Sequence, residues 1–202
     1  MRLERKFYAR DSITVAKELL GKILVHEIDG KKIAGKIVET EAYMGIEDKA
    51  AHSYGGRRTP RNEVMYGNAG FSYVFLIYGL HSCFNVVVNK EGNPQAVLIR
   101  AVEPIEGMEE MAVLRYKTSL NKLTKYQVKA LTNGPGKLSS ALNIDRSSNG
   151  ADLCGGTLYI EEGYEDQIDI TTTKRVGIDY AEEAADFPWR FYITGNPHVS
   201  VK

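Results

Sequence analysis

Apolar and polar residues alternate along the N-terminal part of the chain in a way that predicts a helix followed by a hairpin. Asp11 and Ser12 are placed to cap a helix that runs to about Leu20, and Gly21 is placed to end it. Two apolar-rich segments, 22–28 and 31–43, then flank the pair Asp29-Gly30. A pair of this kind between such segments is typical of a tight β-hairpin turn.

The rest of the chain predicts more strands than helices. Residues 44–70 are irregular, and a loop of this length in a compact domain is usually functional or disordered. Further strands are expected at 71–78, 83–89, 95–102, 157–161, 166–172 and 189–194, and helices at 106–116 and 137–142. No repeat, low-complexity tract or linker interrupts the pattern. We therefore expect one α+β domain over residues 1–202, built on an antiparallel or mixed sheet.

The composition indicates a folded protein with no excess of charge. Of the 202 residues, 43% are hydrophobic and 26% are charged, which is enough for a core and excludes disorder. Lys+Arg and Asp+Glu each number 26, so the formal net charge is zero. A neutral chain is not held to nucleic acid by its total charge, although zero net charge is still compatible with a local basic patch.

Cysteine, histidine and hydropathy patterns exclude several classes of protein. Cys83 and Cys154 are far apart and form no CxxC or Cys/His pattern, so neither a disulfide scaffold nor a zinc module is expected. The histidines are too scattered for a metal site. The first ten residues lack an apolar core, and no apolar run approaches the roughly 20 residues of a membrane span. We expect no signal peptide, no membrane partner and a cytoplasmic location.

The first candidate for chemistry lies at the end of the 31–43 strand. Glu39, Glu41 and Tyr43 are two residues apart and so project from one face. A carboxylate at the point where a strand enters a long loop could position water or act as a general base. Paired carboxylates also suit a sugar hydrolase, and a solvated strand face would by itself account for two glutamates.

The loop after this strand concentrates positive charge. Arg57, Arg58 and Arg61 lie within five positions next to Gly55-Gly56, and His52 precedes them. Arginine suits phosphate because its planar fork offers several donors. A local anion site and a solvated basic turn are both consistent with this pattern.

Aromatic residues and one more arginine complete the candidates. Tyr73 and Phe75 alternate onto one strand face, and Tyr78 precedes a glycine that permits a sharp turn. A ring at such a turn could be a wedge, although ordinary sheet packing would also explain it. Arg100 closes an apolar run and needs a carboxylate partner, for which Glu41 and Glu103 are both available.

These segments together resemble a known family. The motifs, in chain order, are VETEAYMGIEDKAAHS (38–53), GGRRTPRN (55–62), YVFLIYG (73–79), CFN (83–85), VLIRAVEP (97–104), NGPGKLSSAL (133–142), RVGI (175–178) and RFYITGNPHVS (190–200). They are similar to the successive signatures of the alkyladenine (3-methyladenine) DNA glycosylases, the mammalian-type methylpurine-DNA glycosylases. The resemblance covers nearly the whole chain. It implies a single compact domain with a curved, mostly antiparallel β-sheet core flanked by helices.

The resemblance also implies roles for individual residues. Glu41 matches the carboxylate that activates the attacking water, Arg100 the arginine that helps to hold it, and Val176 the position whose backbone carbonyl completes the water site. The base pocket would comprise Tyr43, His52, Phe75 and Asn85, with Asn85 crowding the 2-amino group of guanine. Tyr78 matches the wedge that fills the duplex, and Arg57, Arg58, Arg61 and His81 would contact DNA. The chain departs from relatives at Phe75, which lacks a tyrosine hydroxyl, and at His81, where some relatives have another aromatic residue.

The implied activity is base-excision repair. The enzyme would flip alkylated or deaminated purines such as 3-methyladenine, 7-methylguanine, hypoxanthine and ethenoadenine out of double-stranded DNA. It would hydrolyse the N-glycosidic bond with water and no cofactor, as a monomer, and leave an abasic site. No lysine occupies a position that the motifs mark as nucleophilic, which indicates a monofunctional enzyme. The alternatives are a binding module without activity, and a hydrolase of ordinary sugars or free nucleosides that uses Glu39 with Glu41.

Overall fold

Strand β2 (Lys31–Tyr43) is the centre of the molecule. The computed structural model describes residues 1–164 and 167–201. Strands β1 (Ile23–Ile28), β5 (Gln95–Glu106) and β8 (Arg190–Ile193) all pair with β2 in antiparallel register. The turn between β1 and β2 has positive φ angles at Asp29 (49°) and Gly30 (76°), which confirms the predicted tight hairpin. Because β2 has neighbours on both edges, its second half is enclosed by β5 and β8.

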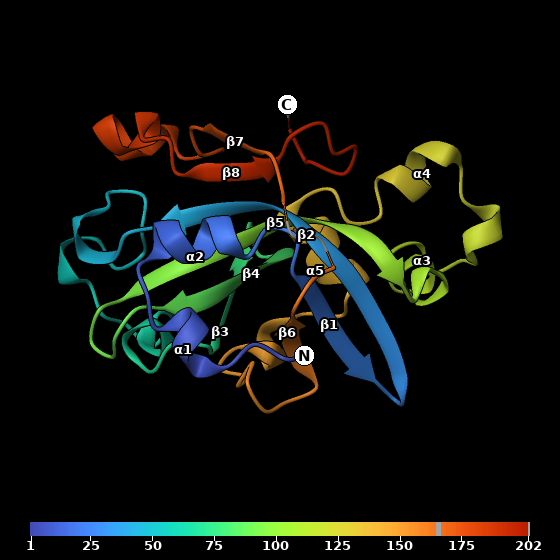
Figure 1. Cartoon of the computed structure of the whole chain (residues 1–202), viewed down its shortest axis with the longest axis horizontal. Coiled ribbons are helices and arrows are strands. Elements are labelled where there is room, and N and C mark those ends of the chain that lie inside the picture. The colour runs from blue at the N-terminus through green and yellow to red at the C-terminus, as the bar shows by residue number, and fades with distance from the viewer. Residues whose placement is uncertain (165–166, 202) are drawn as a thin grey trace.

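The remaining strands extend this sheet on both sides. They are β3 (Ser72–Ile77), β4 (His81–Val88), β6 (Leu158–Glu161) and β7 (Ile170–Thr173). The order is β3-β4-β5-β2-β1-β6, with β7 and β8 forming a pair that joins through β8 to β2. Figure 1 shows the sheet curving across the molecule, with β7 and β8 lying along one side of it. The expected α+β domain with a curved antiparallel sheet is confirmed.

Short helices cover the sheet. They are α1 (Arg5–Tyr8), α2 (Ser12–Glu18), α3 (Met108–Tyr116), α4 (Lys125–Lys129) and α5 (Pro135–Ala141). The Asp11 carboxylate accepts a hydrogen bond from the Thr14 N–H at 3.0 Å, which confirms the predicted cap of α2. Helix α2 packs on β2 and β5, and α5 on β4 and β5. Val15, Ile37 and Leu138 belong to the single large core cluster between them.

Three predictions of local structure differ from the fold. The helix expected at 106–116 begins only at Met108, because β5 runs to Glu106 and Gly107 turns the chain with φ of 76°. The strand expected at 166–172 is β7, which spans Ile170–Thr173; its expected first residue, 166, lies outside the described residues. Helices α1 and α4 were not expected, since four or five residues are too few to show helical periodicity.

The loop 44–70 is ordered by its own polar groups. It contains the 3₁₀ helices η1 (Gly45–Glu47), η2 (Tyr54–Gly56) and η3 (Glu63–Tyr66). Buried Asn62 donates to the carbonyl oxygens of His52 at 3.0 Å and Arg57 at 2.9 Å, and accepts from the Thr59 N–H at 2.7 Å. Asn62 thus fixes the shape of residues 52–62 within this loop.

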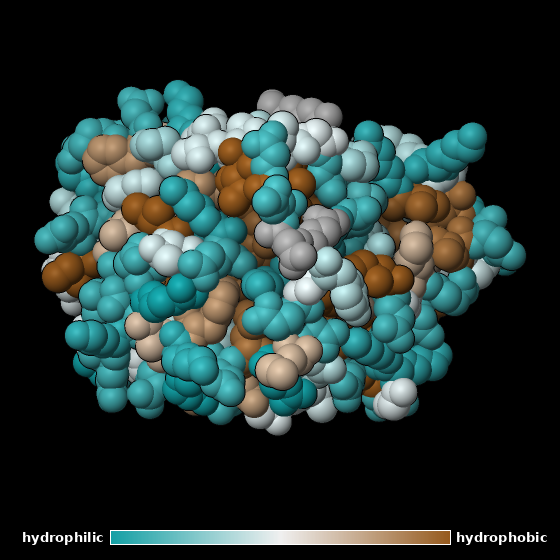
Figure 2. Space-filling view, in the orientation of Figure 1, coloured by the Kyte–Doolittle hydropathy of each residue, from teal (hydrophilic) through white to brown (hydrophobic). Residues whose placement is uncertain are grey.

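The surface mixes polar and apolar areas. Figure 2 shows mostly hydrophilic residues with several hydrophobic areas among them, one of which lies near α3 and α4. The other 3₁₀ helices are η4 (Leu120–Lys122), η5 (Arg146–Ser148) and η6 (Asp179–Asp186). Within residues 1–164 and 167–201, no helix combines the length and apolar sequence needed to cross a bilayer.

Candidate active site

A cavity of about 400 Å³ lies where β3, β4 and β5 meet the loop 44–70 and the segment after β7. This volume is within the range of small-molecule sites in proteins. Its lining is largely aromatic and apolar, with Arg61, Asn85 and Arg100 as polar members. The aromatic and imidazole rings among the lining residues are Tyr43, His52, Tyr73, Phe75, Tyr78 and Tyr180.

An irregularity in the pairing of β2 with β5 places the charged residues of the site. Thr40 lies opposite Ile99 and Glu39 opposite Ala101, so Arg100 has no direct partner across the strands. Such a bulge bends a strand and redirects a side chain. The Arg100 Nη1 atom lies 3.2 Å from Glu41 Oε1, and both side chains are almost fully buried. Glu41, one of the two predicted partners, is therefore confirmed, whereas Glu103 contacts Lys36 and Asn196 instead.

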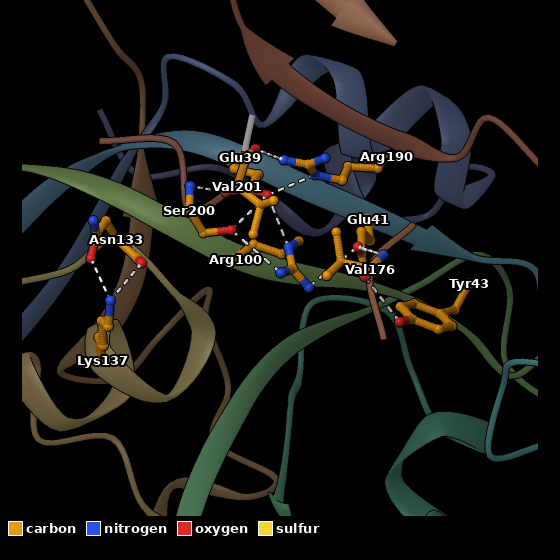
Figure 3. A network of polar contacts seen from close by, with 10 residues as sticks. All are labelled: Glu39, Glu41, Tyr43, Arg100, Asn133, Lys137, Val176, Arg190, Ser200 and Val201. Atoms are coloured by element: carbon orange, nitrogen blue, oxygen red, sulfur yellow. Dashed lines mark hydrogen bonds and ion pairs between the residues drawn. The ribbon is translucent and has the colours of Figure 1, made fainter. Parts of the chain in front are cut away.

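Glu41 is held by three donors from three parts of the chain (Figure 3). Besides Arg100, the Val176 N–H donates to Oε1 at 2.8 Å, and the Tyr43 hydroxyl donates to Oε2 at 3.0 Å. Burial, and next the Glu41 carboxylate, raise the pKa of Tyr43 well above its ordinary value, so the hydroxyl keeps its proton. All three partners line the cavity, whereas Glu41 lies directly behind them with no exposed surface.

Glu39 is also buried, so the interpretation of this strand face as solvated is wrong. Its carboxylate accepts from Arg100 Nε at 2.9 Å and from Arg190 Nε at 2.7 Å. Burial lowers the pKa of Arg100, but Glu41 and Glu39 raise it by more, and the net pKa is raised. Neither carboxylate lines the cavity, but all three partners of Glu41 do, whereas among the donors to Glu39 only Arg100 does. The arrangement therefore offers one carboxylate beside the cavity and contradicts a sugar hydrolase built on the Glu39 and Glu41 pair.

A second buried ion pair fixes the segment that carries Val176. Arg175 Nη1 lies 2.6 Å from Asp48 Oδ2, and Nη2 lies 2.8 Å from Oδ1, with both side chains fully buried. Arg175 also donates to the Ala42 carbonyl oxygen at 3.0 Å. A two-pronged pair of this kind fixes orientation as well as distance. The Val176 N–H is thereby positioned against Glu41, while the carbonyl role implied for Val176 stays a prediction.

His52 forms one wall of the cavity. Its Nδ1 lies 2.7 Å from the Tyr73 hydroxyl oxygen, and its ring centroid lies 4.5 Å from that of Phe75 in an edge-on arrangement. Burial, and then the nearby Arg61 and Arg57, lower the pKa of His52 to about 4. Burial raises the pKa of Tyr73 to about 12. At neutral pH this wall is therefore an uncharged imidazole and an intact phenol.

Tyr78 lies at the opening of the cavity. It occupies the turn between β3 and β4 with a φ of 52°, followed by Gly79 with a φ of 68°. Its side chain is 91% exposed although it also lines the cavity. A large aromatic residue in the left-handed region, with its ring in solvent, is uncommon. The turn presents the ring outward, as a wedge requires.

The remaining predicted DNA contacts are not all equivalent. The Arg61 guanidinium lies 5.1 Å from the Phe75 ring centroid and lines the cavity, whereas Arg58 is paired with Glu63 through two hydrogen bonds. Arg57 is exposed, and its side chain forms no ion pair among the residues that the structure describes. His81 is exposed and borders a separate groove with residues of α5.

The structure therefore brings most of the predicted site residues to one cavity and leaves others outside it. Residues that line it are Tyr43, His52, Arg61, Phe75, Tyr78, Asn85, Arg100 and Val176, with Glu41 directly behind. Arg57, Arg58 and His81 do not line it. Sequence reasoning did not assign Met65, Tyr73, Cys83 and Tyr180 to the site, although they also line the cavity. Only Tyr73 gave a usable signal, since it alternates with Phe75 on one strand face.

Comparison with known proteins now places the chain. Residues 6–197 match the sequence model of the family described as methylpurine-DNA glycosylase. A Desulfitobacterium hafniense protein named "Putative 3-methyladenine DNA glycosylase" is 66% identical over 100% of this chain and 99% of its own length. Proteins of the same name from Clostridium acetobutylicum and Clostridium tetani are 63% and 56% identical, over 100% of this chain and 98% and 100% of their lengths. The chain therefore belongs to the methylpurine-DNA glycosylase family and is a monofunctional DNA glycosylase, a hydrolase of N-glycosyl bonds that serves DNA repair.

Proposed function

We propose that this glycosylase removes alkylated and deaminated purines from double-stranded DNA by flipping the base into the cavity. The proposed substrates are 3-methyladenine, 7-methylguanine, hypoxanthine and ethenoadenine. The observation that carries the proposal is the pairing of buried Glu41 with Arg100 at 3.2 Å behind an aromatic-lined cavity whose opening carries Tyr78. The names of the relatives support an alkylated base as substrate.

Tyr78 would supply the first step. A base inside a duplex cannot reach Glu41, so it must leave the stack at a cost of a few kcal/mol. The exposed ring would enter the duplex and replace part of the lost stacking. Arg57 and Arg61, which lie in the same basic loop, would contact phosphates. Insertion of the Tyr78 ring requires a duplex, whereas a hydrolase of free nucleosides would have no use for such a ring.

The cavity would then hold the purine by stacking and by hydrogen bonds. Stacking of a base on aromatic rings contributes roughly 1–3 kcal/mol. His52 is neutral at physiological pH, and donation from the Tyr73 hydroxyl to Nδ1 would place the imidazole proton on Nε2. It would thus be a donor to the purine edge that adds no positive charge, which suits a cationic base such as 3-methyladenine. Asn85, whose amide is fixed by the Tyr73 carbonyl oxygen at 3.1 Å, would crowd the 2-amino group of guanine.

Glu41 would act on the sugar side. As the bond from the base nitrogen to C1′ breaks, positive charge grows on the sugar and the electron pair leaves with the base. The carboxylate would stabilise this charge and accept a proton from a water that adds to C1′. Arg100, Tyr43 and the Val176 N–H keep the carboxylate oriented toward the cavity wall. The products would be the free base and an abasic site.

The test is incubation with a duplex that contains one hypoxanthine or one ethenoadenine, followed by alkali cleavage of abasic sites. We expect strand breaks at the lesion with the wild-type chain and none above background with Glu41→Gln. Absence of product from these duplexes and from methylated DNA would refute the proposal. Lesion binding without product, unchanged in Glu41→Gln, would instead identify a binding module. We further propose that the chain acts as a monomer on chromosomal DNA in the cytoplasm, since one domain that acts on one lesion needs no second subunit.

A further inference from the structure

A second buried carboxylate stands beside the proposed catalytic one but cannot act on a substrate. Glu39 accepts hydrogen bonds from Arg100 Nε at 2.9 Å, Arg190 Nε at 2.7 Å and the Ser200 N–H at 2.7 Å. The Ser200 hydroxyl lies 3.0 Å away and is a fourth donor. Three of these donors contact Oε1 and the Ser200 N–H contacts Oε2, so both carboxylate oxygens are engaged within the protein. Glu41 is buried to the same degree, but its partners all line the cavity, whereas Arg190 and Ser200 lie outside the lining, so the role that we consider for Glu39 is an indirect one.

Arg100 connects Glu39 with Glu41. Its Nε contacts Glu39, its Nη1 contacts Glu41, and its Nη2 lies 3.3 Å from the Ser200 hydroxyl (Figure 3). Because a guanidinium is planar and rigid, contacts at Nε and Nη2 also fix where Nη1 points. Without them, the guanidinium would be held on its Glu41 side by one contact of 3.2 Å. The orientation of Arg100 at Glu41 therefore depends on Glu39 and Ser200.

The C-terminal segment brings Ser200 to this place. Val199 is buried, Arg190 Nη2 donates to the Val201 carbonyl oxygen, and Asn196 donates to Glu103 Oε2 at 2.9 Å. These contacts seat residues 196–201 against β5 and β8. Glu39 and Ser200 are separated by 161 positions in the sequence. They come into contact because the C-terminal segment packs here.

We propose that Glu39 and Ser200 are positioning residues for base excision, and that the C-terminal segment is thus a working part of the site. They act through Arg100, whose guanidinium they hold in the orientation that keeps the Glu41 carboxylate directed at the cavity. The inference rests on the proposed role of Glu41. Arg190 contributes to the same arrangement, because its guanidinium is a second positive charge beside Glu39.

The experiment measures single-turnover excision from a hypoxanthine duplex and, separately, the Kd for that duplex. Ser200→Ala removes one hydroxyl that contacts Arg100 and Glu39, and we expect a rate about tenfold lower with unchanged Kd. Glu39→Gln removes a charged acceptor, and we expect a rate about a hundredfold lower, again with unchanged Kd. Ser119→Ala is the matched control, because its hydroxyl contacts Asn121 and not Arg100.

A double-mutant cycle separates positioning from general support of the fold. Arg100→Lys keeps the charge but lacks the planar fork that reaches Ser200. If Ser200 acts through Arg100, Ser200→Ala causes no further loss of rate in the Arg100→Lys chain. A tenfold loss in both backgrounds, or Ser200→Ala with the wild-type rate, would overturn the inference even if Glu39→Gln failed to fold.

The same assays distinguish this inference from the function on which it rests. Wild-type excision that is lost in Glu41→Gln, combined with full activity of Ser200→Ala, would refute the positioning role alone. An inactive wild-type chain would refute the proposed function, and the positioning role with it.

Discussion

The two ends of the cavity are built in opposite ways. At the closed end, Glu41 is fully buried and held by Arg100, Tyr43 and the Val176 N–H. At the open end, Tyr78 is 91% exposed, sits on a turn with φ of 52°, and makes no side-chain hydrogen bond among the described residues. The closed end is strongly constrained by its surroundings, whereas the open end is constrained by its backbone alone.

This contrast separates what each end can contribute. In a buried charged network, removal of one partner can leave another charge buried and unpaired, so a substitution there can change stability as well as chemistry. An exposed ring contributes almost nothing to folding and is available for a partner. A positive φ at a tyrosine costs about 1–3 kcal/mol and is retained where the geometry serves another purpose. Substitutions at the two ends should therefore change different measured quantities.

The largest expected effect is on the rate of base excision when Glu41 is replaced. Glu41→Gln keeps the shape but removes the charge that stabilises the sugar and accepts the proton of water. We expect the single-turnover rate to fall by about 10²–10⁴. Binding to a lesion duplex, measured by fluorescence anisotropy, should be preserved because Glu41 does not line the cavity.

The variant also tests whether the closed end acts through charge. Arg100 keeps its contact with Glu39 at 2.9 Å in Glu41→Gln, so the chain should still fold. Thermal unfolding followed by circular dichroism provides this control. A folded Glu41→Gln chain with the wild-type rate would remove Glu41 from the mechanism.

The next effect concerns pH and stability at the cavity wall. The pKa of His52 is lowered to about 4, mainly by burial, against about 6.5 for an ordinary histidine. Between these values the unfolded chain binds a proton that the folded chain does not, so the free energy of unfolding falls as the pH falls. The difference accumulates to on the order of 3 kcal/mol by pH 4, at about 1.4 kcal/mol per pKa unit.

Urea unfolding at pH 7, 5.5 and 4.5 measures this contribution. His52→Asn lacks the titrating imidazole, so its free energy of unfolding should depend less on pH over the same range. If the free energy of unfolding changed equally with pH in the two chains, folding would not lower the pKa of His52. At neutral pH this loss of stability is absent, since His52 is then largely uncharged in both the folded and the unfolded chain.

At the open end the expected effect is on DNA affinity alone. Tyr78→Ser removes the ring that would replace a flipped base, and stacking of this kind contributes roughly 1–3 kcal/mol. We expect the Kd for a hypoxanthine duplex to rise tenfold to hundredfold, measured by fluorescence anisotropy, with no loss of thermal stability. Tyr126→Ser is the matched control, because Tyr126 is also exposed, at 78%, but lies on α4. Equal affinity of both variants would exclude a wedge at Tyr78.

The fold was predictable where the signal is local. Asp29-Gly30 between two apolar runs predicts the β1–β2 hairpin, and Asp11 predicts the start of α2, because each depends on residues within a few positions. The end of β5 was missed, since Glu103 to Glu106 look like the polar start of a helix. Only the pairing of this segment with β2 shows that it continues as a strand.

The site was predictable for single residues but not for their network. The need of Arg100 for a carboxylate predicts Glu41 or Glu103 as its partner without choosing between them. Alternation along a strand does not reveal the bulge that directs Arg100 at Glu39 and Glu41. Burial of Glu39 requires Arg190 and Ser200, which are 151 and 161 positions away. Contacts at such separations are set by the tertiary fold, and one sequence alone carries no signal for them.

The smallest expected effect distinguishes two neighbouring arginines by the salt dependence of DNA binding. Each phosphate neutralised by the protein contributes about 0.9 to the slope of log K against log salt concentration. Arg57 forms no ion pair within residues 1–164 and 167–201, whereas Arg58 donates to Glu63 through Nε and Nη2. Arg57→Ala should therefore lower the slope by about 0.9, and Arg58→Ala should change it less. Binding titrations between 50 and about 200 mM salt measure both slopes. A larger change for Arg58→Ala would mean that DNA displaces Glu63 and that this arginine, not its neighbour, holds the phosphate.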